Sequence, residues 1–338
     1  MMWRVAILGA TGLVGRTMLQ ILEERGFPVE EPRLLASDRT PDRSLAFRGR
    51  AIPVEPVDAR SFDGIDVALF ASNNKVSQVW ARPAQEAGAR VVDNSSAFRY
   101  QENVPLVVPE VNGALLESQP TLVANPNCST IAVVMALAPL ARVAGLERVV
   151  VVTYQSVSGA GSEALEELER GIREGLNGPP PPQRDGSPPF AYNVVPRIDR
   201  FEDNGYTREE MKVVWETRKI LGLPQLPVTA TAVRVPVRVG HAAVVNLTLS
   251  RPLDPGEARA LWSDFPGLEV VDDPAHDRYP TPLEAANRDT VLVGRGRRDL
   301  SQPHGLEFFV AADNLRKGAA LNAVQIAEQL CRVVTGAR

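Results

Sequence analysis

The sequence predicts an α/β protein with two domains, one built on a parallel sheet and the other an α+β domain with a mixed sheet. Short apolar runs alternate with helical patterns in the first half of the chain, which is typical of βαβ units. Candidate strands in the second half are longer, and in 241–250 apolar residues alternate with others, as in a sheet with one exposed face. A length of 338 residues is enough for two such domains.

The elements of the first domain follow from its apolar pattern. Apolar residues recur at helical spacing between 13 and 24 and predict a helix there. The run Val5-Ala6-Ile7-Leu8 before it predicts a buried strand. Further strands are predicted at 33–36, 66–70 and 90–93, with a second helix near 77–87.

The second domain begins near the turn Asn125-Pro126-Asn127. We expect a helix over 129–143, starting at Ser129 or Thr130, then strands at 148–155 and 241–250 and a helix over 162–176. Four consecutive prolines in 178–189 exclude a helix or an internal strand and predict a surface loop. A closing helix, 318–334, is expected to pack back onto the first domain.

Composition excludes several classes of protein. Hydrophobic residues make up 44% and charged residues 23% of the chain, which is too apolar for a disordered protein. The net charge of −4 lacks the basic field of a nucleic-acid binder. No apolar run approaches the roughly 20 residues of a membrane span, and no signal-peptide pattern is found. Two distant cysteines build neither a disulfide framework nor a zinc site, so we expect a cytoplasmic protein without metal.

A glycine-rich turn, Gly9-Ala10-Thr11-Gly12-Leu13-Val14-Gly15, lies between the first predicted strand and helix. Glycine at 9, 12 and 15 permits a tight turn and close backbone approach, and amides at the helix N-terminus can bind a pyrophosphate. The spacing differs from the usual G-x-G-x-x-G. The prediction therefore depends on the position of the motif in the turn between a predicted strand and a predicted helix. We therefore predict a Rossmann-type dinucleotide-binding domain, with a plain tight turn as the alternative.

The choice of dinucleotide depends on the end of the second strand, Ser37-Asp38-Arg39-Thr40. Ser37 and Arg39 together suit the 2′-phosphate of NADP, because a hydroxyl and a guanidinium both bind a phosphate dianion. Asp38 suits the 2′-hydroxyl of NAD. We favour NADP, and NAD stays open.

Cys128 precedes a long predicted helix, where the helix dipole favours loss of the thiol proton. It is therefore a candidate nucleophile, with a buried inert thiol as the alternative. Cys331 falls on the apolar face of the closing helix and is predicted to lie in the core. Among the three histidines, His241 opens a long strand and is the best placed acid–base partner, although a structural histidine is equally compatible with its position.

Together these segments resemble the aspartate-β-semialdehyde dehydrogenase family over nearly the whole chain. The cysteine block and the Arg-x6-His spacing are specific to it, whereas the glycine loop is not. The segments that carry the resemblance are Gly9–Gly15, Asp93-Asn94-Ser95-Ser96-Ala97-Phe98-Arg99, Asn125-Pro126-Asn127-Cys128-Ser129-Thr130, Gln155-Ser156-Val157-Ser158-Gly159-Ala160-Gly161, Tyr206–Lys212, Glu216–Ile220, Arg234-Val235-Pro236-Val237-Arg238-Val239-Gly240-His241 and Asp313–Ala320.

The resemblance implies NADPH-dependent reduction of β-aspartyl phosphate to aspartate semialdehyde and phosphate through a thioacyl enzyme. It implies that Cys128 is the nucleophile, His241 the acid–base catalyst and Gln155 the residue that orients the intermediate. An imidazole of near neutral pKa could take the thiol proton and later protonate the alkoxide-like oxygen. The implied substrate residues are Arg234 for the α-carboxylate, Glu209 for the α-ammonium, and Arg99, Lys212 and Asn127 for the phosphate.

The resemblance also implies where the cofactor and a second subunit bind. The NADP-binding domain would be 1–127 with 314–338, and the catalytic and dimerisation domain 128–313. A homodimer is expected, and a tetramer stays open. The residues expected to contact NADP are Gly9, Thr11, Gly12, Leu13, Val14, Gly15, Ser37, Arg39, Thr40, Ser158, Gly159 and Asn314.

Two alternatives and one departure qualify this hypothesis. N-acetyl-γ-glutamyl-phosphate reductase has the same architecture, but it typically has Gly-Cys-Tyr-Pro where this chain has Asn127-Cys128-Ser129-Thr130. A noncatalytic paralogue would have lost the cysteine, which this chain keeps. The family often has small residues where this chain has Asn73-Asn74-Lys75, and this loop would border the nicotinamide.

Overall fold

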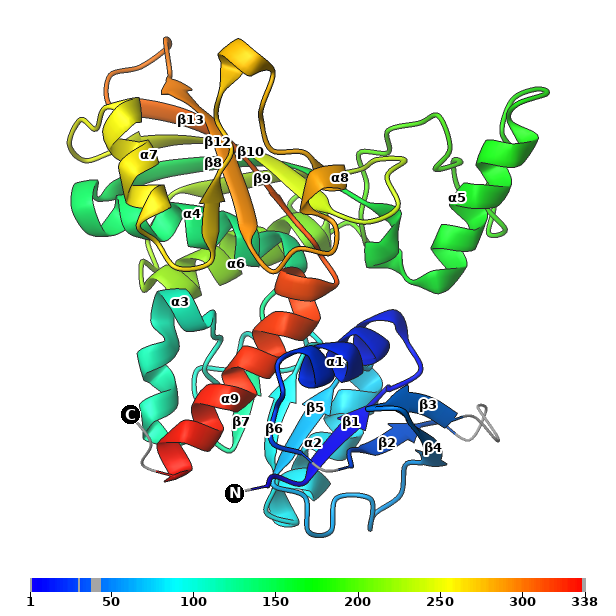
Figure 1. Cartoon of the computed structure of the whole chain (residues 1–338). Helices are drawn as coiled ribbons and strands as arrows, with labels where there is room; N and C mark the ends of the chain where they lie inside the picture. The colour runs from blue at the N-terminus through cyan, green and yellow to red at the C-terminus, as the bar shows by residue number, and fades with distance from the viewer. Residues whose placement is uncertain (1, 30, 38–43, 336–338) are drawn as a thin grey trace. The chain divides into compact units, whose positions relative to one another are not determined.

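The computed structural model describes residues 2–29, 31–37 and 44–335 of the chain (Figure 1). The chain divides into two compact units. One contains Met1–Asn127 and Ala319–Arg338, and the other contains Cys128–Gly318. The chain returns to the first unit at Ala319, slightly later than the predicted position 314.

The first unit is built around a sheet of order β3-β4-β2-β1-β5-β6-β7. Every neighbouring pair is parallel except β3 with β4. The predicted parallel sheet is therefore confirmed. Its elements are β1 (Val5–Leu8), α1 (Leu13–Glu24), β2 (Arg33–Ala36), β3 (Ser44–Phe47), β4 (Arg50–Pro56), β5 (Val67–Phe70), α2 (Asn74–Glu86), β6 (Arg90–Asp93), α3 (Pro109–Asn112), the 3-10 helix η1 (Gly113–Ser118), β7 (Leu122–Ala124) and α9 (Leu321–Thr335).

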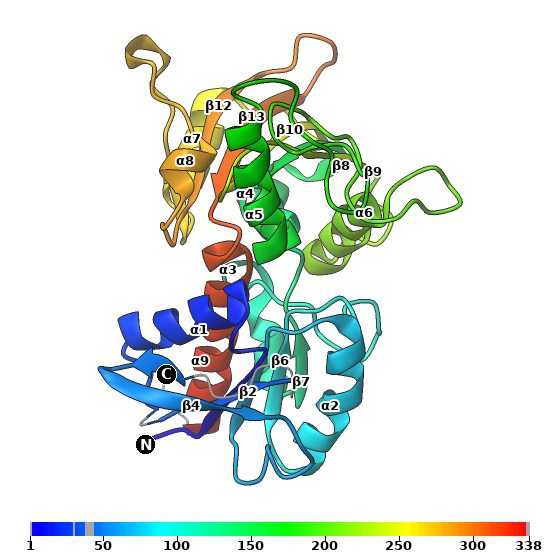
Figure 2. The same cartoon turned by 90° about the vertical axis from the view of Figure 1, so that its right-hand side faces the viewer.

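The alternation of side chains along β1 explains why this sheet is covered on both faces. Val5 and Ile7 pack into a core with residues of α1 and α9. Ala6 and Leu8 point to the opposite face and pack in a second core with Ala81 of α2. Figure 2 shows α1 and α9 on one side of the strands and α2 on the other. A strand buried on both faces is apolar throughout, which is why the sequence of β1 predicts a buried strand.

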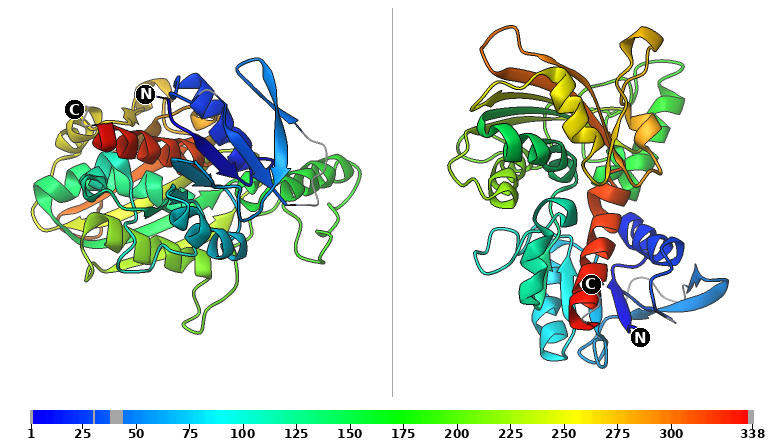
Figure 3. Two further views of the ribbon diagram at one scale, coloured as in Figure 1. Left: turned by 90° about the horizontal axis from the view of Figure 1, so that it is seen from below. Right: turned by 60° about the vertical axis from the view of Figure 1, so that its left-hand side comes forward.

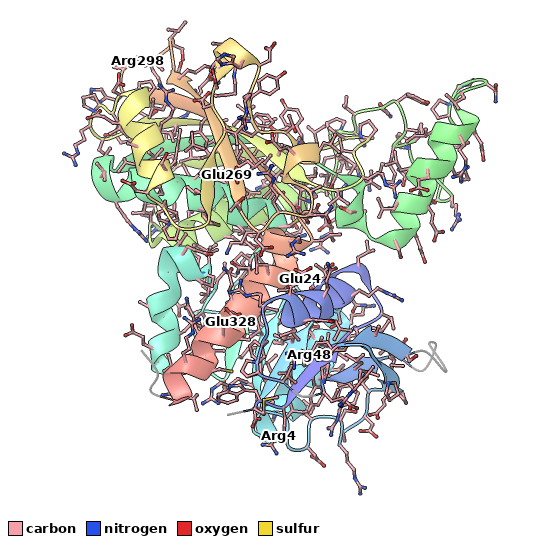
Figure 4. All side chains as sticks on the ribbon, in the orientation of Figure 1. Arg4, Glu24, Arg48, Glu269, Arg298 and Glu328 are labelled. Carbon is pink, nitrogen blue, oxygen red and sulfur yellow. The ribbon has the colours of Figure 1, made fainter. Side chains whose placement is uncertain are left out.

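The closing helix belongs to this unit, as the apolar pattern of 318–334 predicted. A π-helical turn, η4 (Arg316–Ala320), precedes α9. Glu328 on α9, labelled in Figure 4, accepts two hydrogen bonds of 2.7 Å from the Arg25 guanidinium at the end of α1. Such a bidentate pair fixes the orientation of both side chains. It therefore holds the two helices on this face in register.

The second unit is built around a mixed six-stranded sheet of order β11-β12-β13-β10-β8-β9, as predicted. β8 pairs in parallel with β9, and β11 with β12, while β10 is antiparallel to both β8 and β13. Its elements are α4 (Cys128–Ala144), β8 (Leu146–Gln155), the 3-10 helix η2 (Val157–Ala160), α5 (Ser162–Glu174), α6 (Arg208–Leu221), β9 (Val228–Arg234), β10 (His241–Leu249), α7 (Pro255–Ser263), β11 (Leu268–Val270), the 3-10 helix η3 (Pro274–His276), α8 (Pro282–Ala285), β12 (Val291–Arg298) and β13 (Gly305–Ala312).

One face of this sheet is covered by α4, α6 and α7 (Figure 3). Trp262 of α7 packs edge-on against Phe308 of β13 and donates a hydrogen bond of 3.0 Å to the Ala136 carbonyl of α4. On the other face, Tyr154 of β8 stacks on Phe309 of β13 while remaining 36% exposed. The sheet therefore has one buried face and one that is partly open.

The differences from the predicted elements have physical causes. Helix α2 begins at Asn74 rather than Ser77, because the Asn73 side chain accepts a hydrogen bond from the Val76 amide and starts the helix there. Strand β4 alternates two buried residues with exposed ones and carries Pro53, so its apolar signal is weak. Helix α4 starts at Cys128 itself, one residue earlier than predicted. The segment 178–189 forms a surface loop, as the prolines predicted.

Candidate active site

Three polar side chains meet at one end of the mixed sheet because of its strand directions. Gln155 ends β8 and pairs in register with Arg234, which ends the parallel strand β9. His241 begins the antiparallel strand β10, one residue beyond the Ala242–Tyr154 pair. All three side chains are buried. They project from the face that α4 and α6 cover.

Two helix starts complete this cluster. Helix α4 begins at Cys128 and helix α6 at Arg208, one residue before Glu209. The start of α6 is fixed by a capping box, in which Thr207 and Glu210 exchange side-chain and backbone hydrogen bonds. Glu210 also accepts a hydrogen bond of 2.9 Å from the Ala232 amide of β9, which ties the helix start to the sheet.

A chain of polar contacts runs across the start of α6. Gln155 donates a hydrogen bond of 3.1 Å to Glu209, and the Lys212 ammonium donates one of 3.0 Å to the other oxygen of Glu209. Lys212 also donates to Asp199 at 3.0 Å. Burial favours the neutral amine of Lys212, yet Glu209 and Asp199 together raise its pKa above the usual value. Lys212 is therefore a cation at neutral pH.

Arg234 is the central charge of the cluster. It donates a hydrogen bond of 2.8 Å to the Ser156 carbonyl. Burial lowers the pKa of its guanidinium, while the charges of Glu209 and Cys128 oppose that change. An arginine remains protonated under such shifts, so Arg234 is a buried cation beside the thiol.

His241 is neutral at physiological pH. Burial is the main cause that lowers its pKa to about 3, the charge of Arg234 lowers it further, and Glu209 opposes the change. The near neutral pKa expected of this imidazole is therefore wrong, because the ring is buried beside a guanidinium. Its Nδ1 accepts a hydrogen bond of 3.0 Å from the Ser156 amide.

Arg99 and Asn127, the other two residues of the predicted phosphate site, lie in the first unit. Both are buried, and Arg99 donates a hydrogen bond of 2.6 Å to the Asn94 carbonyl. The second unit thus brings together Cys128, Gln155, Glu209, Lys212, Arg234 and His241 from the predicted set.

The glycine-rich turn forms a backbone cradle within the first unit. Gly9 has φ +88°, and a Cβ there would lie 2.6 Å from the Ala71 carbonyl oxygen of the loop after β5. A Cβ on Gly15 would lie 2.2 Å from the Gly9 oxygen. Gly12 caps α1 and accepts the first intrahelical hydrogen bond, from Arg16, so the amides of 13–15 have no carbonyl partner in the helix.

This cradle fits a dinucleotide pyrophosphate. It lies where β1 is flanked by β2 and β5, the switch point at which open parallel sheets bind ligands. Three of the predicted cofactor residues, Thr11, Leu13 and Val14, are partly exposed along it. Ser37 follows β2 and is exposed, whereas Arg39 and Thr40, like Asp38, lie outside the described residues.

The departure at Asn73-Asn74-Lys75 has a structural explanation. Asn73 caps α2, as described above. Asn74 accepts a hydrogen bond of 2.9 Å from the Ser96 amide and donates one to the Ser96 hydroxyl. Lys75 is exposed. Asn73 thus fixes the start of α2, and Asn74 joins that start to the loop after β6.

Two residues of the site were missed from the sequence. Ser156 is fully buried and contacts both His241 and Arg234, and only its place next to Gln155 could have indicated it. Asp199 binds Lys212 from a left-handed backbone conformation, φ +71°. Asn314 and Ser158, predicted cofactor contacts, hydrogen-bond to each other in the second unit.

Two family models match the chain. "Semialdehyde dehydrogenase, NAD binding domain" matches residues 4–119, and "Semialdehyde dehydrogenase, dimerisation domain" matches residues 137–317. The chain is 48% identical to the aspartate-semialdehyde dehydrogenase of Legionella pneumophila, over 97% of this chain and 95% of that protein. The chain belongs to the aspartate-semialdehyde dehydrogenase family.

Other relatives agree with this placement in the family. The aspartate-semialdehyde dehydrogenase of Aquifex aeolicus is 46% identical over 98% of both chains. The crystal structure of aspartate semialdehyde dehydrogenase II from Vibrio cholerae complexed with ASA superimposes with a TM-score of 0.94. That structure is 45% identical and covers 98% of this chain and 99% of its own.

Two kinds of feature are not found in the described part of the chain. None of its helices is long and apolar enough to cross a membrane. No group of three or more histidine, cysteine, aspartate or glutamate side chains is arranged there to hold a metal ion.

Proposed function

We propose that this protein catalyses the reversible, NADPH-dependent reduction of β-aspartyl phosphate to L-aspartate 4-semialdehyde and phosphate. The observation that carries the proposal is the cluster of Cys128, Gln155, Glu209, Arg234 and His241 in a member of this family. The reaction would serve biosynthesis of lysine, methionine and threonine, including the diaminopimelate route, in the cytoplasm.

The proposed chemistry uses a covalent intermediate on Cys128. The thiolate attacks the acyl carbon, a C–S bond forms, and phosphate leaves with the electron pair of the broken C–O bond. A nicotinamide bound at the cradle would be the source of the hydride that reduces the thioester. The C–S bond then breaks, and the aldehyde leaves as Cys128 regains its thiolate. Two easier steps thus replace one difficult step.

The buried charges of the second unit match the substrate. The Arg234 guanidinium would bind the α-carboxylate through parallel hydrogen bonds. Glu209 would receive the α-ammonium, and Gln155, which already binds Glu209, would orient the acyl group. Lys212, Arg99 and Asn127 would bind the phosphate, which needs a cationic site.

NADP is the proposed dinucleotide, held by the cradle from Gly9 to Gly15. A Ser37 hydroxyl and an Arg39 guanidinium would suit its 2′-phosphate, while Asp38 would suit NAD. The further predicted contacts are Thr40, Ser158, Gly159 and Asn314. A homodimer, with a tetramer as the larger alternative, would form through the second unit, and the partly open face that carries Tyr154 and Phe309 supports this.

The decisive experiment is phosphate-dependent reduction of NADP⁺ with aspartate semialdehyde. Parallel reactions would use NAD⁺, N-acetylglutamate semialdehyde and the Cys128→Ala variant. We expect turnover of aspartate semialdehyde with NADP⁺ by the native protein, and no turnover by the Cys128→Ala variant. Turnover with the acetylated aldehyde alone would identify the protein as an N-acetyl-γ-glutamyl-phosphate reductase. Turnover with neither aldehyde would favour a noncatalytic paralogue.

A further inference from the structure

The chain contains three Asn-Gly pairs, and the structure places them in three different environments. They are Asn112-Gly113, Asn177-Gly178 and Asn204-Gly205. Asparagine is one of the chemically labile residues of proteins, because the backbone nitrogen of the next residue can attack its side-chain amide carbon. Glycine at that next position leaves the nitrogen unshielded, since glycine has no Cβ. The three pairs are therefore alike in sequence, and only their surroundings distinguish them.

The pair at 177–178 lies in the loop that follows α5, and both of its residues are exposed (Figure 1). Within the described part of the chain, the Asn177 side chain makes no hydrogen bond and the Gly178 amide donates none. A Cβ on Gly178 would meet nothing within 4 Å. The Asn177 side chain can therefore rotate until its amide carbon reaches the Gly178 nitrogen, and no hydrogen bond has to break first.

The pair at 204–205 is also exposed, but it is held in a turn before α6. The Gly205 amide donates a hydrogen bond of 3.0 Å to the Glu202 carbonyl. The Asn204 side chain accepts a hydrogen bond of 3.1 Å from the Tyr206 amide and donates one of 3.4 Å to the Met211 sulfur. Attack by the Gly205 nitrogen would have to break its own hydrogen bond and move a side chain that is held at both ends.

The pair at 112–113 lies at the junction of α3 and η1 and is partly buried. The Asn112 side chain accepts a hydrogen bond of 2.9 Å from the Val108 amide and donates one of 2.9 Å to the Leu106 carbonyl. Both ends of this side-chain amide are therefore bound to the backbone that precedes it. Rotation towards the Gly113 nitrogen would break both hydrogen bonds.

We propose that Asn177 is a site of spontaneous deamidation in the folded protein, and that the fold protects Asn112 and Asn204. The Gly178 nitrogen forms a bond to the side-chain amide carbon of Asn177. Its proton passes to the leaving nitrogen, and ammonia departs with the electron pair of the broken C–N bond. Water then adds to one carbonyl of the succinimide and breaks one of the two ring C–N bonds. The product is aspartate or, when the backbone C–N bond breaks, isoaspartate.

The modification changes the charge of the chain as well as the backbone of this loop. Each event adds one negative charge to a chain whose net charge is −4, so ion exchange separates the modified form from the native one. Asn177 is not among the residues proposed to bind substrate or dinucleotide. The inference is therefore independent of the proposed function, and its test needs no measurement of turnover.

Ageing of the full-length protein at mildly alkaline pH, followed by peptide mapping with mass spectrometry, tests the proposal. The three pairs fall in three different tryptic peptides, so each rate is measured separately. The same measurement in concentrated urea gives the rates without the fold, and there the three pairs should react at similar rates.

The expected rates in the folded protein follow from the hydrogen bonds at each pair. Asn177 should react within about threefold of its rate in urea, because it has no hydrogen bond to lose. Asn112 and Asn204 should each react at least about tenfold more slowly than in urea, because their hydrogen bonds must break before the attack.

Gly178→Ala is the matched variant, because its Cβ shields the attacking nitrogen and meets nothing else within 4 Å. We expect modification of Asn177 to slow at least about fivefold, since alanine has a Cβ and fewer backbone conformations than glycine. The rates at Asn112 and Asn204 should stay native in this variant. A native rate at Asn177 would show that the backbone nitrogen is not the attacking group.

Two further results would overturn the proposal. Slowing of Asn177 by the fold beyond the threefold limit would show that its loop is held as firmly as the other two pairs. A rate at Asn204 equal to that at Asn177 would show that exposure decides the reaction, and that the hydrogen bonds of the turn before α6 do not protect it.

Discussion

The proposed cofactor site and the proposed catalytic cluster are constructed in opposite ways. The cradle from Gly9 to Gly15 consists of backbone, and its shape requires glycines, which have no side chain. A Cβ on Gly15, for example, would lie only 2.2 Å from the Gly9 oxygen. The catalytic cluster consists of buried side chains that backbone groups orient, as Ser156 orients His241. Substitutions should therefore act on the first by steric exclusion and on the second through charge and hydrogen bonding.

The largest effect is expected from Gly15→Ala. Its Cβ would lie 2.2 Å from the Gly9 oxygen and 2.8 Å from the Ala10 Cα, both backbone atoms that cannot move without opening the turn. We expect a loss of about 3 kcal/mol or more in unfolding free energy, with loss of nucleotide binding. Urea denaturation measures the unfolding free energy, and calorimetric titration measures the NADPH affinity.

Gly178→Ala is the control for this substitution, because a Cβ there meets nothing within 4 Å. Its unfolding midpoint should match that of the native protein. If Gly15→Ala binds NADPH with native affinity, the cradle is not the nucleotide site.

The next effect is expected in the catalytic cluster, from Arg234→Gln. The variant loses the buried cation that faces Glu209 and Cys128. Removing one partner of a buried charged pair costs about 2–5 kcal/mol, so kcat/KM for aspartate semialdehyde should fall at least about 30-fold. NADPH affinity should fall less than kcat/KM, since the Gly9–Gly15 cradle lies in the other unit and Arg234 is not among the proposed dinucleotide contacts. An equal loss of NADPH affinity would show that Arg234 also helps to bind the dinucleotide.

The difference in construction also explains how much could be predicted from the sequence. Apolar periodicity gave β1, β2 and α1 at their observed bounds, because a strand buried on both faces leaves a continuous apolar run. Cys128 and His241 were candidates from their positions before a helix and at the start of a strand, whereas the other site side chains came from the family resemblance. Neither kind of reasoning identified Ser156, because its contact with His241 is made by a backbone amide and joins residues 85 positions apart. Such a contact depends on strand register, which no local pattern encodes.

The substitution Gly159→Ala tests whether the catalytic cluster, like the cradle, is sensitive to an added side chain. The Cβ of Gly159→Ala would lie 3.1 Å from His241 Nε2 and 3.2 Å from an Arg234 nitrogen, so both of these side chains would have to shift. Displacement of one hydrogen-bonding group of an active site costs about 100-fold in kcat. Folding should be unaffected, because Gly159 is exposed and the nearby contacts are side-chain atoms. Steady-state kinetics at saturating NADPH measure the effect, and an unchanged kcat would show that the cluster tolerates the added methyl group.

The smallest effect is expected from Asp199→Asn, at the edge of the cluster. Asp199 shares the Lys212 ammonium with Glu209, and its side chain is 38% exposed, so solvent screens its charge. Removing this carboxylate removes a like charge from the proposed phosphate site while Glu209 still holds Lys212. We therefore expect the KM for phosphate to fall about two- to threefold with kcat unchanged. Asp203→Asn, in the neighbouring exposed turn, is the matched control. A rise in the KM for phosphate would instead mean that Asp199 is needed to position Lys212, and that its left-handed backbone conformation is retained for that contact.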